Sequence, residues 1–194
     1  MRRLLTVVAL LFAQTVWSGD LEDGLAAMER KEYTTALSKF RSAAEQGNAV
    51  AQYNLGEVYE NGNGVKRDYK EALRWYLLAA KQGHAEAQKN IGKMYSAGRG
   101  VIQDYKQAVY WLKLAAKQGN DRAQYLIGLM YSLGNGLPKD FIRAHMWLNI
   151  SAVNGDKDSL TVRDDLATDM SPWQVEQAQR MARECMNSNF KKCD

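Results

Sequence analysis

The sequence predicts an all-α fold, an α-solenoid of stacked antiparallel helix pairs, and three observations predict it. Glycines recur with a spacing of 36 residues, at Gly47, Gly83, Gly119 and Gly155. Residues 48–83, 84–119 and 120–155 share eleven identical positions when they are aligned. In each of these repeats, two segments with helical apolar periodicity flank a glycine-containing loop. One such unit cannot bury its apolar face alone, so the units are expected to stack on one another.

Capping residues place the two helices of each repeat. The first helix is expected to begin after an Asn or Asp, at Asn48, Asn120 and Asp156, while His84 breaks this pattern;. The second helix is expected to begin after Asp68 and its counterparts, because a carboxylate there accepts hydrogen bonds from the first-turn N–H groups. It is expected to end at Gly83, where a left-handed residue stops a helix.

The repeated residues fall on one half of the wheel of each helix, and we expect that half to form the core. In the first repeat the identical positions are Ala51, Gln52, Gly56, Tyr59, Gly62, Gly64, Asp68, Ala72, Trp75, Ala80 and Gly83. Small residues let helices approach closely, while Tyr and Trp fill the spaces between them. Trp111 is therefore expected to be a core residue of the second repeat.

The third repeat differs on the outer side of its second helix. Ile142, Met146 and Val153 replace the lysines and arginines that the first two repeats carry there. An apolar outer face needs a cover. A final helix that opens at Ser171 with a capping box and ends near Cys185 is the nearest candidate, and a partner protein is the alternative.

The pattern A-x-A-Q-Y-x-L-G-x-x-Y-x-x-G-x-G-V-x-x-D-Y-x-x-A-x-x-W-Y-x-x-A-A-x-Q-G, from 49 to 83, resembles the Sel-1-like repeat family, whose members are relatives of tetratricopeptide repeats. The other two repeats match it as well. The resemblance implies a right-handed superhelix that binds proteins or peptides. It also implies an adaptor, regulator or host-interaction role in the bacterial envelope or outside the cell.

Weaker segments flank the three repeats. Residues 19–47 are expected to form a degenerate repeat, in which a short helix near 20–30 precedes Phe40 and its neighbours in the register of a second helix. Residues 156–194 are expected to hold a half-repeat, the capping helix that closes the array, and a tail.

The first eighteen residues have the features of a secretory signal. Arg2 and Arg3 precede an apolar run of about ten residues, which is too short for the ~20 that span a bilayer. Val16-Trp17-Ser18 offers acceptable residues for signal peptidase, so cleavage after Ser18 and a periplasmic or secreted protein are expected. An uncleaved anchor or a buried N-terminal helix is the alternative.

The chain has two cysteines, Cys185 and Cys193. Export would place them in an oxidising compartment, where a disulfide between them would persist. The alternative is two free thiols on a frayed tail.

The residues favour binding over catalysis. Neither His84 nor His145 has the neighbours of a metal or catalytic site, so we expect no enzyme activity and no cofactor. The net charge of +4 is mixed in sign, which does not indicate nucleic-acid binding, and no membrane span is expected in the mature chain;. An envelope hydrolase and a purely structural spacer remain as alternatives to an interaction scaffold.

The variable half of each first helix is the expected binding surface, a concave groove in this type of fold. Its candidates are Tyr53, Lys89, Lys93, Arg122 and Tyr125. Tyr and Arg are enriched at binding hot spots. The alternative interpretation is an ordinary solvated face whose tyrosines pack on their neighbours.

Overall fold

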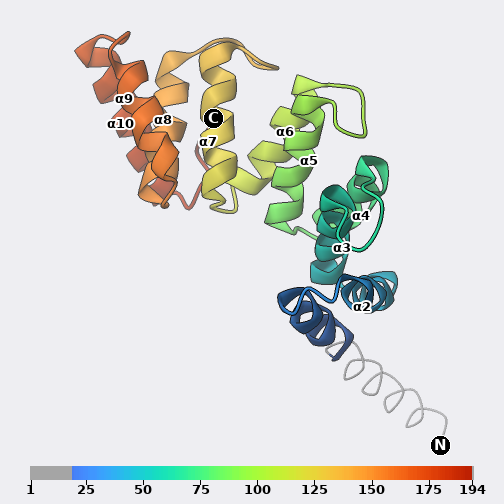
Figure 1. Cartoon of the computed structure of the whole chain (residues 1–194). Coiled ribbons are helices and arrows are strands. Elements are labelled where there is room, and N and C mark those ends of the chain that lie inside the picture. Colours follow the sequence, from blue (N-terminus) through green and yellow to red (C-terminus); the bar gives the residue numbers. More distant parts are fainter. Residues whose placement is uncertain (1–18, 194) are drawn as a thin grey trace, which may run out of the picture. The chain divides into compact units, whose positions relative to one another are not determined.

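The computed structural model describes residues 19–193 and is built of helices (Figure 1). The expected signal segment, residues 1–18, lies outside the described part of the chain. The helices are residues 19–29, α2 (Tyr33–Glu45), α3 (Ala49–Asn61), α4 (Tyr69–Lys81), α5 (Ala85–Ala97), α6 (Tyr105–Ala116), α7 (Asp121–Leu133), α8 (Phe141–Val153), α9 (Lys157–Ala167) and α10 (Pro172–Asn187). No strand occurs between residues 19 and 193, which confirms the all-α prediction.

Two compact units divide the chain, and the second begins at Ala85. The first unit contains the helices from residue 19 to α4. The second contains α5 to α10. Helices pair in sequence order in both units, α3 with α4, α5 with α6 and α7 with α8, as the 36-residue period predicts.

The predicted caps are present. Asp68 Oδ1 accepts hydrogen bonds from the backbone N–H groups of Lys70 at 2.9 Å and Glu71 at 3.1 Å. Asn48 and Asn120 cap the first helices of their repeats by accepting from the backbone three residues on. These bonds satisfy donors that a helix start leaves unpaired, so the sequence sets the boundaries locally.

Three glycines on the first helices allow each helix pair to pack closely. A Cβ on Gly56 would lie 2.6 Å from the ring of Tyr76, and a Cβ on Gly92 would lie 2.5 Å from Leu112 Cγ. Gly128 has the same relationship to Leu148. The glycine that is identical in all three repeats is therefore needed because the second helix of each pair packs too close to leave room for a side chain.

The N-terminal segment forms a complete helix pair. Helix 19–29 packs on α2, and a Cβ on Gly24 would lie 2.7 Å from the ring of Phe40. Lys39 on α2 pairs with Asp20 at 2.8 Å and with Asp23 at 2.9 Å. The connecting loop is only three residues long, so the glycine column falls out of the 36-residue register here.

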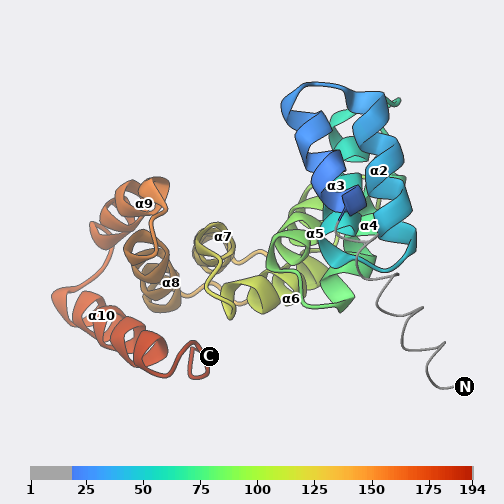
Figure 2. The ribbon, with the colours of Figure 1, turned by 90° about the horizontal axis from the view of Figure 1, so that it is seen from below.

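The C-terminal helix departs from the repeat. α8 packs against both α9 and α10 (Figure 2), so α10 covers the outer face of α8 and does not form a regular pair with α9. Met146 is 1% exposed and packs in one cluster with Ala182 of α10, so α10 covers this part of the apolar face of α8. Val153 remains 65% exposed, so the cover is partial.

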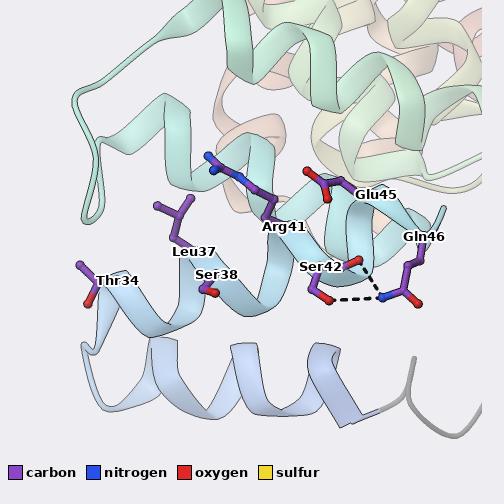
Figure 3. A pocket seen from close by; sticks show the side chains of 7 residues that line it. All are labelled: Thr34, Leu37, Ser38, Arg41, Ser42, Glu45 and Gln46. Atoms are coloured by element: carbon purple, nitrogen blue, oxygen red, sulfur yellow. Dashed lines mark hydrogen bonds between the residues drawn. The ribbon is translucent and has the colours of Figure 1, made fainter.

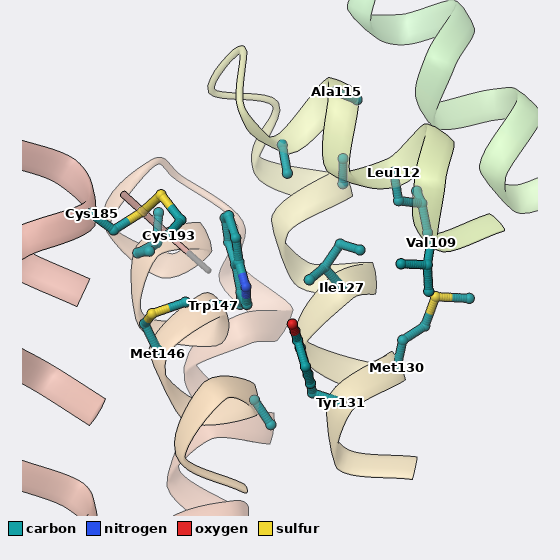
Figure 4. Packing of buried hydrophobic residues seen from close by; sticks show 14 of the residues in the cluster. Val109, Leu112, Ala115, Ile127, Met130, Tyr131, Met146, Trp147, Cys185 and Cys193 are labelled. Carbon is teal, nitrogen blue, oxygen red and sulfur yellow. A yellow bond between two sulfur atoms is a disulfide. The ribbon is translucent and has the colours of Figure 1, made fainter. Parts of the chain in front are cut away.

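The core of the second unit includes the chain's two cysteines (Figure 4). Trp147 and Met146 pack in one cluster with Ile127, and the disulfide Cys185–Cys193 joins α10 to the tail at its edge. Cys193 is 2% exposed, so the tail is part of the packed structure.

The expectation that Trp111 is a core residue was wrong. Trp147 is fully buried and Trp75 is 5% exposed, whereas Trp111 is only partly buried. Its ring lies edge-on to Tyr110, which is itself 55% exposed. Identity at a repeat column predicts the direction of a side chain, but burial depends on what covers that position.

Candidate functional site

A buried glutamine column links successive helices beneath the candidate binding surface. Gln52 Nε2 donates to the carbonyl oxygen of Ala44 at 3.1 Å, and Gln52 Oε1 accepts from Gln82 Nε2 at 2.9 Å. In the second unit, Gln124 Nε2 donates to Ala116 O at 3.1 Å, and Asn154 Nδ2 donates to Gln124 Oε1 at 2.8 Å. The repeated Ala-Gln pair is thus structural, because each buried amide has both of its polar ends paired.

Tyr53, the candidate in the first unit, is held by its neighbours. Its hydroxyl donates to Glu57 Oε1 at 2.6 Å, and its ring stacks on His84 with centroids 4.6 Å apart. The ring of Tyr76 lies 5.8 Å away on the same unit. Tyr53 therefore presents a pre-organised aromatic surface and not a free hydroxyl.

Lys89 and Lys93 lie on α5 and differ in exposure. Lys89 Nζ forms an ion pair with Glu86, whose other carboxylate oxygen accepts from Asn120 Nδ2. Only 16% of the Lys89 side chain is exposed. Lys93 is exposed, so it is the more accessible cation on this helix.

Arg122 and Tyr125 are brought together at the start of α7. The Arg122 guanidinium lies 4.4 Å from the centroid of the Tyr125 ring. It also donates to Asp156 at 3.0 Å and to Asp158 at 2.7 Å, which ties α7 to α9. These bonds to Asp158 and Asp156 raise the pKa of Arg122. Burial acts to raise the pKa of Asp156, but the bonds from Arg122 and Ser159 lower it overall.

The candidate binding residues on α5 and α7 are of two kinds, those that pair with neighbouring side chains and those that are exposed to solvent. Lys89 is paired with Glu86 on its own helix, and Arg122 ties α7 to α9 through Asp156 and Asp158, so both cations are partly neutralised. Lys93 and Leu133, which is 67% exposed, are directed to solvent and have no such role in the described structure. We call the α5 and α7 side that bears Lys89, Lys93, Arg122, Tyr125 and Leu133 the first-helix face.

Several hollows lie elsewhere on the described surface. One of about 470 Å³ runs along a single side of α2, where Gln46 Nε2 donates to the carbonyl and hydroxyl oxygens of Ser42 (Figure 3). Its lining is mostly polar and comes from one helix. Polar groups on one side of a single helix do not surround a ligand as those of a binding pocket do.

Two further hollows flank the start of α8. One of about 320 Å³ is lined by Lys113, Tyr131, Leu137, Pro138, Asp140 and Arg143. One of about 410 Å³ is lined by Lys139, Asp140, Phe141, Ile142 and Gln174. Neither hollow is apparent from the sequence, because the lining residues come from the four helices α6, α7, α8 and α10 and from the loop before α8.

No group of three or more His, Cys, Asp or Glu residues suited to a metal ion occurs within residues 19–193. His145 is 2% exposed, and burial, followed by the nearby charge of Arg163, lowers its pKa. Both cysteines are in the disulfide. In the same range, no helix is long and apolar enough to cross a membrane.

The family model for the Sel1 repeat matches residues 49–84, 85–120 and 121–156, more than half of the chain. The chain belongs to the Sel1 repeat family. Each matched range contains one observed helix pair. The ranges differ by one residue from the 36-residue units that the sequence predicts.

Solved Sel1 repeat structures are similar to this chain. A protective antigen present in uropathogenic Escherichia coli strains, which displays an SLR fold, is 30% identical with a TM-score of 0.76. The match covers 82% of this chain and 34% of the antigen, so this chain spans about a third of that protein. A Sel1 repeat protein from Oxalobacter formigenes is also 30% identical, with a TM-score of 0.73 over 84% of this chain and 72% of that one. No match was found among the curated proteins.

Membership of the Sel1 repeat family indicates a helical scaffold of a kind generally used for protein–protein interaction. The repeated columns explain the scaffold, since they supply caps, close contacts and the glutamine links. The columns that differ between the repeats, among them those of Lys93 and Leu133, have no such structural role to explain them.

Proposed function

We propose that this Sel1 repeat protein is an exported, non-catalytic scaffold that binds a protein or peptide partner on its first-helix face. The observation that carries the proposal is the difference in burial between repeated and variable positions on α5 and α7. Their repeated residues are buried, while Lys93 and Leu133 at variable positions are exposed beside a braced Arg122–Tyr125 pair. Arg and Tyr held in place lose little side-chain entropy on binding, which favours a hot spot.

Two observations support an extracytoplasmic location. A disulfide is stable in oxidising compartments and rare in the cytosol, and Cys185 and Cys193 are paired;. The similar E. coli protein is described as a protective antigen, as expected of a protein accessible to the host. Cleavage after Ser18 would give a mature chain beginning at Gly19.

The absence of catalysis is supported by the chemistry of the candidates. Both cysteines are oxidised to the disulfide, so neither supplies a thiolate. His145 is buried and kept neutral by its surroundings, and His84 is stacked on Tyr53. A general base needs contact with a substrate proton, which a fully buried imidazole lacks.

Site-specific photocrosslinking tests the binding face. A photoreactive phenylalanine analogue replaces Lys93, or, as a matched control, Lys106 on the outer side of α6, in protein expressed in its native host. Lys93 and Lys106 are both exposed lysines of the same unit. We expect a discrete crosslinked partner from position 93 only. Equal crosslinking from both positions, or from position 106 alone, would reject the first-helix face. Sequencing the mature N-terminus in the same preparation tests export, and recovery of Met1 would contradict it.

A further inference from the structure

The segment that follows α10, residues 188–193, runs from the end of that helix onto the core of the second unit. Cys193 is 2% exposed, and its disulfide to Cys185 joins this segment to the last turn of α10 (Figure 4). Between the two cysteines, the ring of Phe190 packs on the hydrophobic cluster of the second unit. A Cβ on Gly119 would lie 3.6 Å from Phe190 Cε2, so this ring lies against the turn between α6 and α7. We call residues 188–193 the strap.

The backbone of the strap has an unfavourable conformation at two successive residues. Asn189 has a φ of 53° and Phe190 a φ of 61°. This left-handed region is uncommon for residues other than glycine, and Asn tolerates it better than a bulky residue such as Phe. Backbone strain of this kind persists only where the surrounding structure enforces it. Something must therefore hold Phe190 in place.

The hydrogen bonds of the strap shape it without attaching it to α6 or α7. The backbone N–H of Phe190 donates to the carbonyl oxygen of Cys185 at 3.0 Å, and that of Lys192 donates to Ser188 Oγ at 2.9 Å. The first bond joins the strap to the last turn of α10, and the second joins the strap to itself. Ordering the backbone of this segment costs more free energy than the burial of Phe190 and Cys193 returns. The covalent bond at Cys193 therefore makes the difference that keeps the strap docked.

α10 itself packs on α8 through residues that precede the disulfide. Ala178 and Ala182 are fully buried, and Ala182 lies in one cluster with Met146 of α8. These contacts do not involve the strap. Breaking the bond between Cys185 and Cys193 can therefore release the strap while α10 remains in place.

We propose that the strap is a redox-controlled element, which the disulfide holds over the α6–α7 turn and which a dithiol reductant releases. Release uncovers the apolar surface beneath Phe190 and relieves the strain in its backbone. The oxidised and reduced proteins then differ in the surface that they present at this turn, while the helix pairs stay the same. This inference is independent of the first-helix face and stands or falls without it.

The release is an ordinary thiol–disulfide exchange. A thiolate of the dithiol attacks Cys193 Sγ, the S–S bond breaks, and Cys185 leaves as a thiolate that takes up a proton. The second thiol of the reductant then displaces Cys193 from the mixed disulfide. The dithiol is oxidised to a disulfide, and the protein is left with two thiols.

Hydrogen–deuterium exchange with mass spectrometry tests the proposal on the purified protein, oxidised or treated with dithiothreitol. Peptides that cover the strap report the amides of Phe190 and Lys192. We expect reduction to speed their exchange about tenfold or more, because the strap leaves the core. Peptides from residues 172–182 should change by less than about twofold, because α10 stays packed. Cys185→Ser/Cys193→Ser should match the reduced protein without any reductant. Unchanged exchange in the strap, or an equal acceleration along α10, would overturn the proposal.

Two further variants test the coupling between Phe190 and the disulfide. Both cysteines are buried, so a dithiol reaches them when the strap opens. Phe190→Ala removes the docked ring and keeps the bond, so the rate of reduction by dithiothreitol should rise about fivefold or more. Lys191→Ala is the matched control at an exposed position of the strap, and its rate should stay within about twofold of wild type;. Circular dichroism verifies that each variant is folded. Equal rates for Phe190→Ala and wild type would show that the docked ring does not protect the bond.

Discussion

Gly128 on α7 and Leu148 on α8 lie so close that a Cβ on Gly128 would come 2.8 Å from Leu148 Cγ. The same helix pair also brings the Ala144 carbonyl oxygen to 3.2 Å from that Cβ position. In α9 the corresponding column is Asp164, which is exposed, and no second helix packs there in the regular way. The loss of glycine at this column coincides with the end of the array, since α10 packs on α8 instead.

The first prediction follows from this contact. Gly128→Ala should lower the free energy of unfolding by about 1–3 kcal/mol, because overpacking outweighs the gain of about 1 kcal/mol in helix propensity. Asp164→Ala, at the same column where no such pairing occurs, should change it by less than about 0.5 kcal/mol. Urea unfolding measures both. A stabilised Gly128→Ala variant would show that the helices can separate without cost.

The second prediction concerns the glutamine links. Gln124 is fully buried and pairs with both Ala116 O and Asn154 Nδ2. Gln124→Leu keeps the volume but leaves these groups unpaired, so it should destabilise the protein by about 1–3 kcal/mol. Gln103→Leu, at an exposed position, is the control and should be nearly neutral. Similar unfolding midpoints for the two variants would argue against a structural role for the link.

The third prediction separates two tryptophans of one repeat column. Trp147→Ala should cost about 3–5 kcal/mol, because it opens a cavity in the second unit's core. Trp111→Ala should cost distinctly less, since that ring is partly exposed. Differential scanning calorimetry compares their melting temperatures. A lower melting temperature for Trp111→Ala than for Trp147→Ala would contradict the burial difference.

The fourth prediction concerns the disulfide. The bond between Cys185 and Cys193 closes a short loop, with a sequence separation of 8 residues. Such a loop stabilises the native state by about 2–3 kcal/mol in the chain-entropy model. A dithiol reductant should therefore lower the melting temperature of the wild type, whereas the Cys185→Ser/Cys193→Ser variant should not respond. Thiol titration of native protein that finds two free thiols would contradict the pairing.

The fifth prediction is a pH dependence from His145. Burial, followed by the charge of Arg163, lowers its pKa below 6.5 in the folded state, although Asp164 acts in the opposite direction. Below a pH of about 6.5 the unfolded state then binds the extra proton, so this contribution to stability is full above that pH and is lost as pH falls. His145→Leu should remove this component, so its urea midpoint should fall less than that of wild type between about pH 7.5 and pH 5. Parallel curves would exclude the effect.

The sequence by itself determined the helices and their order. Asp68 accepts from its own first turn, and Gly62 adopts the left-handed conformation at the end of α3, so both boundaries depend on residues within a few positions. The 36-residue period then predicted the pairing of helices, because a unit that recurs along the chain packs its two helices on one another in the same way each time. These are short-range and periodic features, which a single sequence displays directly.

Only the tertiary structure decided which residues at the same repeat position have the same burial and the same neighbours. Trp111 and Trp147 share a column but differ in burial, and Lys89 and Lys93 share a helix but differ in accessibility. The two hollows beside α8 are lined by Lys113, Tyr131 and Gln174 from α6, α7 and α10, which no spacing in the sequence connects. Burial and charge pairing depend on the neighbours that a position acquires in three dimensions, and at the end of the array those neighbours change because α10 leaves the repeat geometry to cover α8.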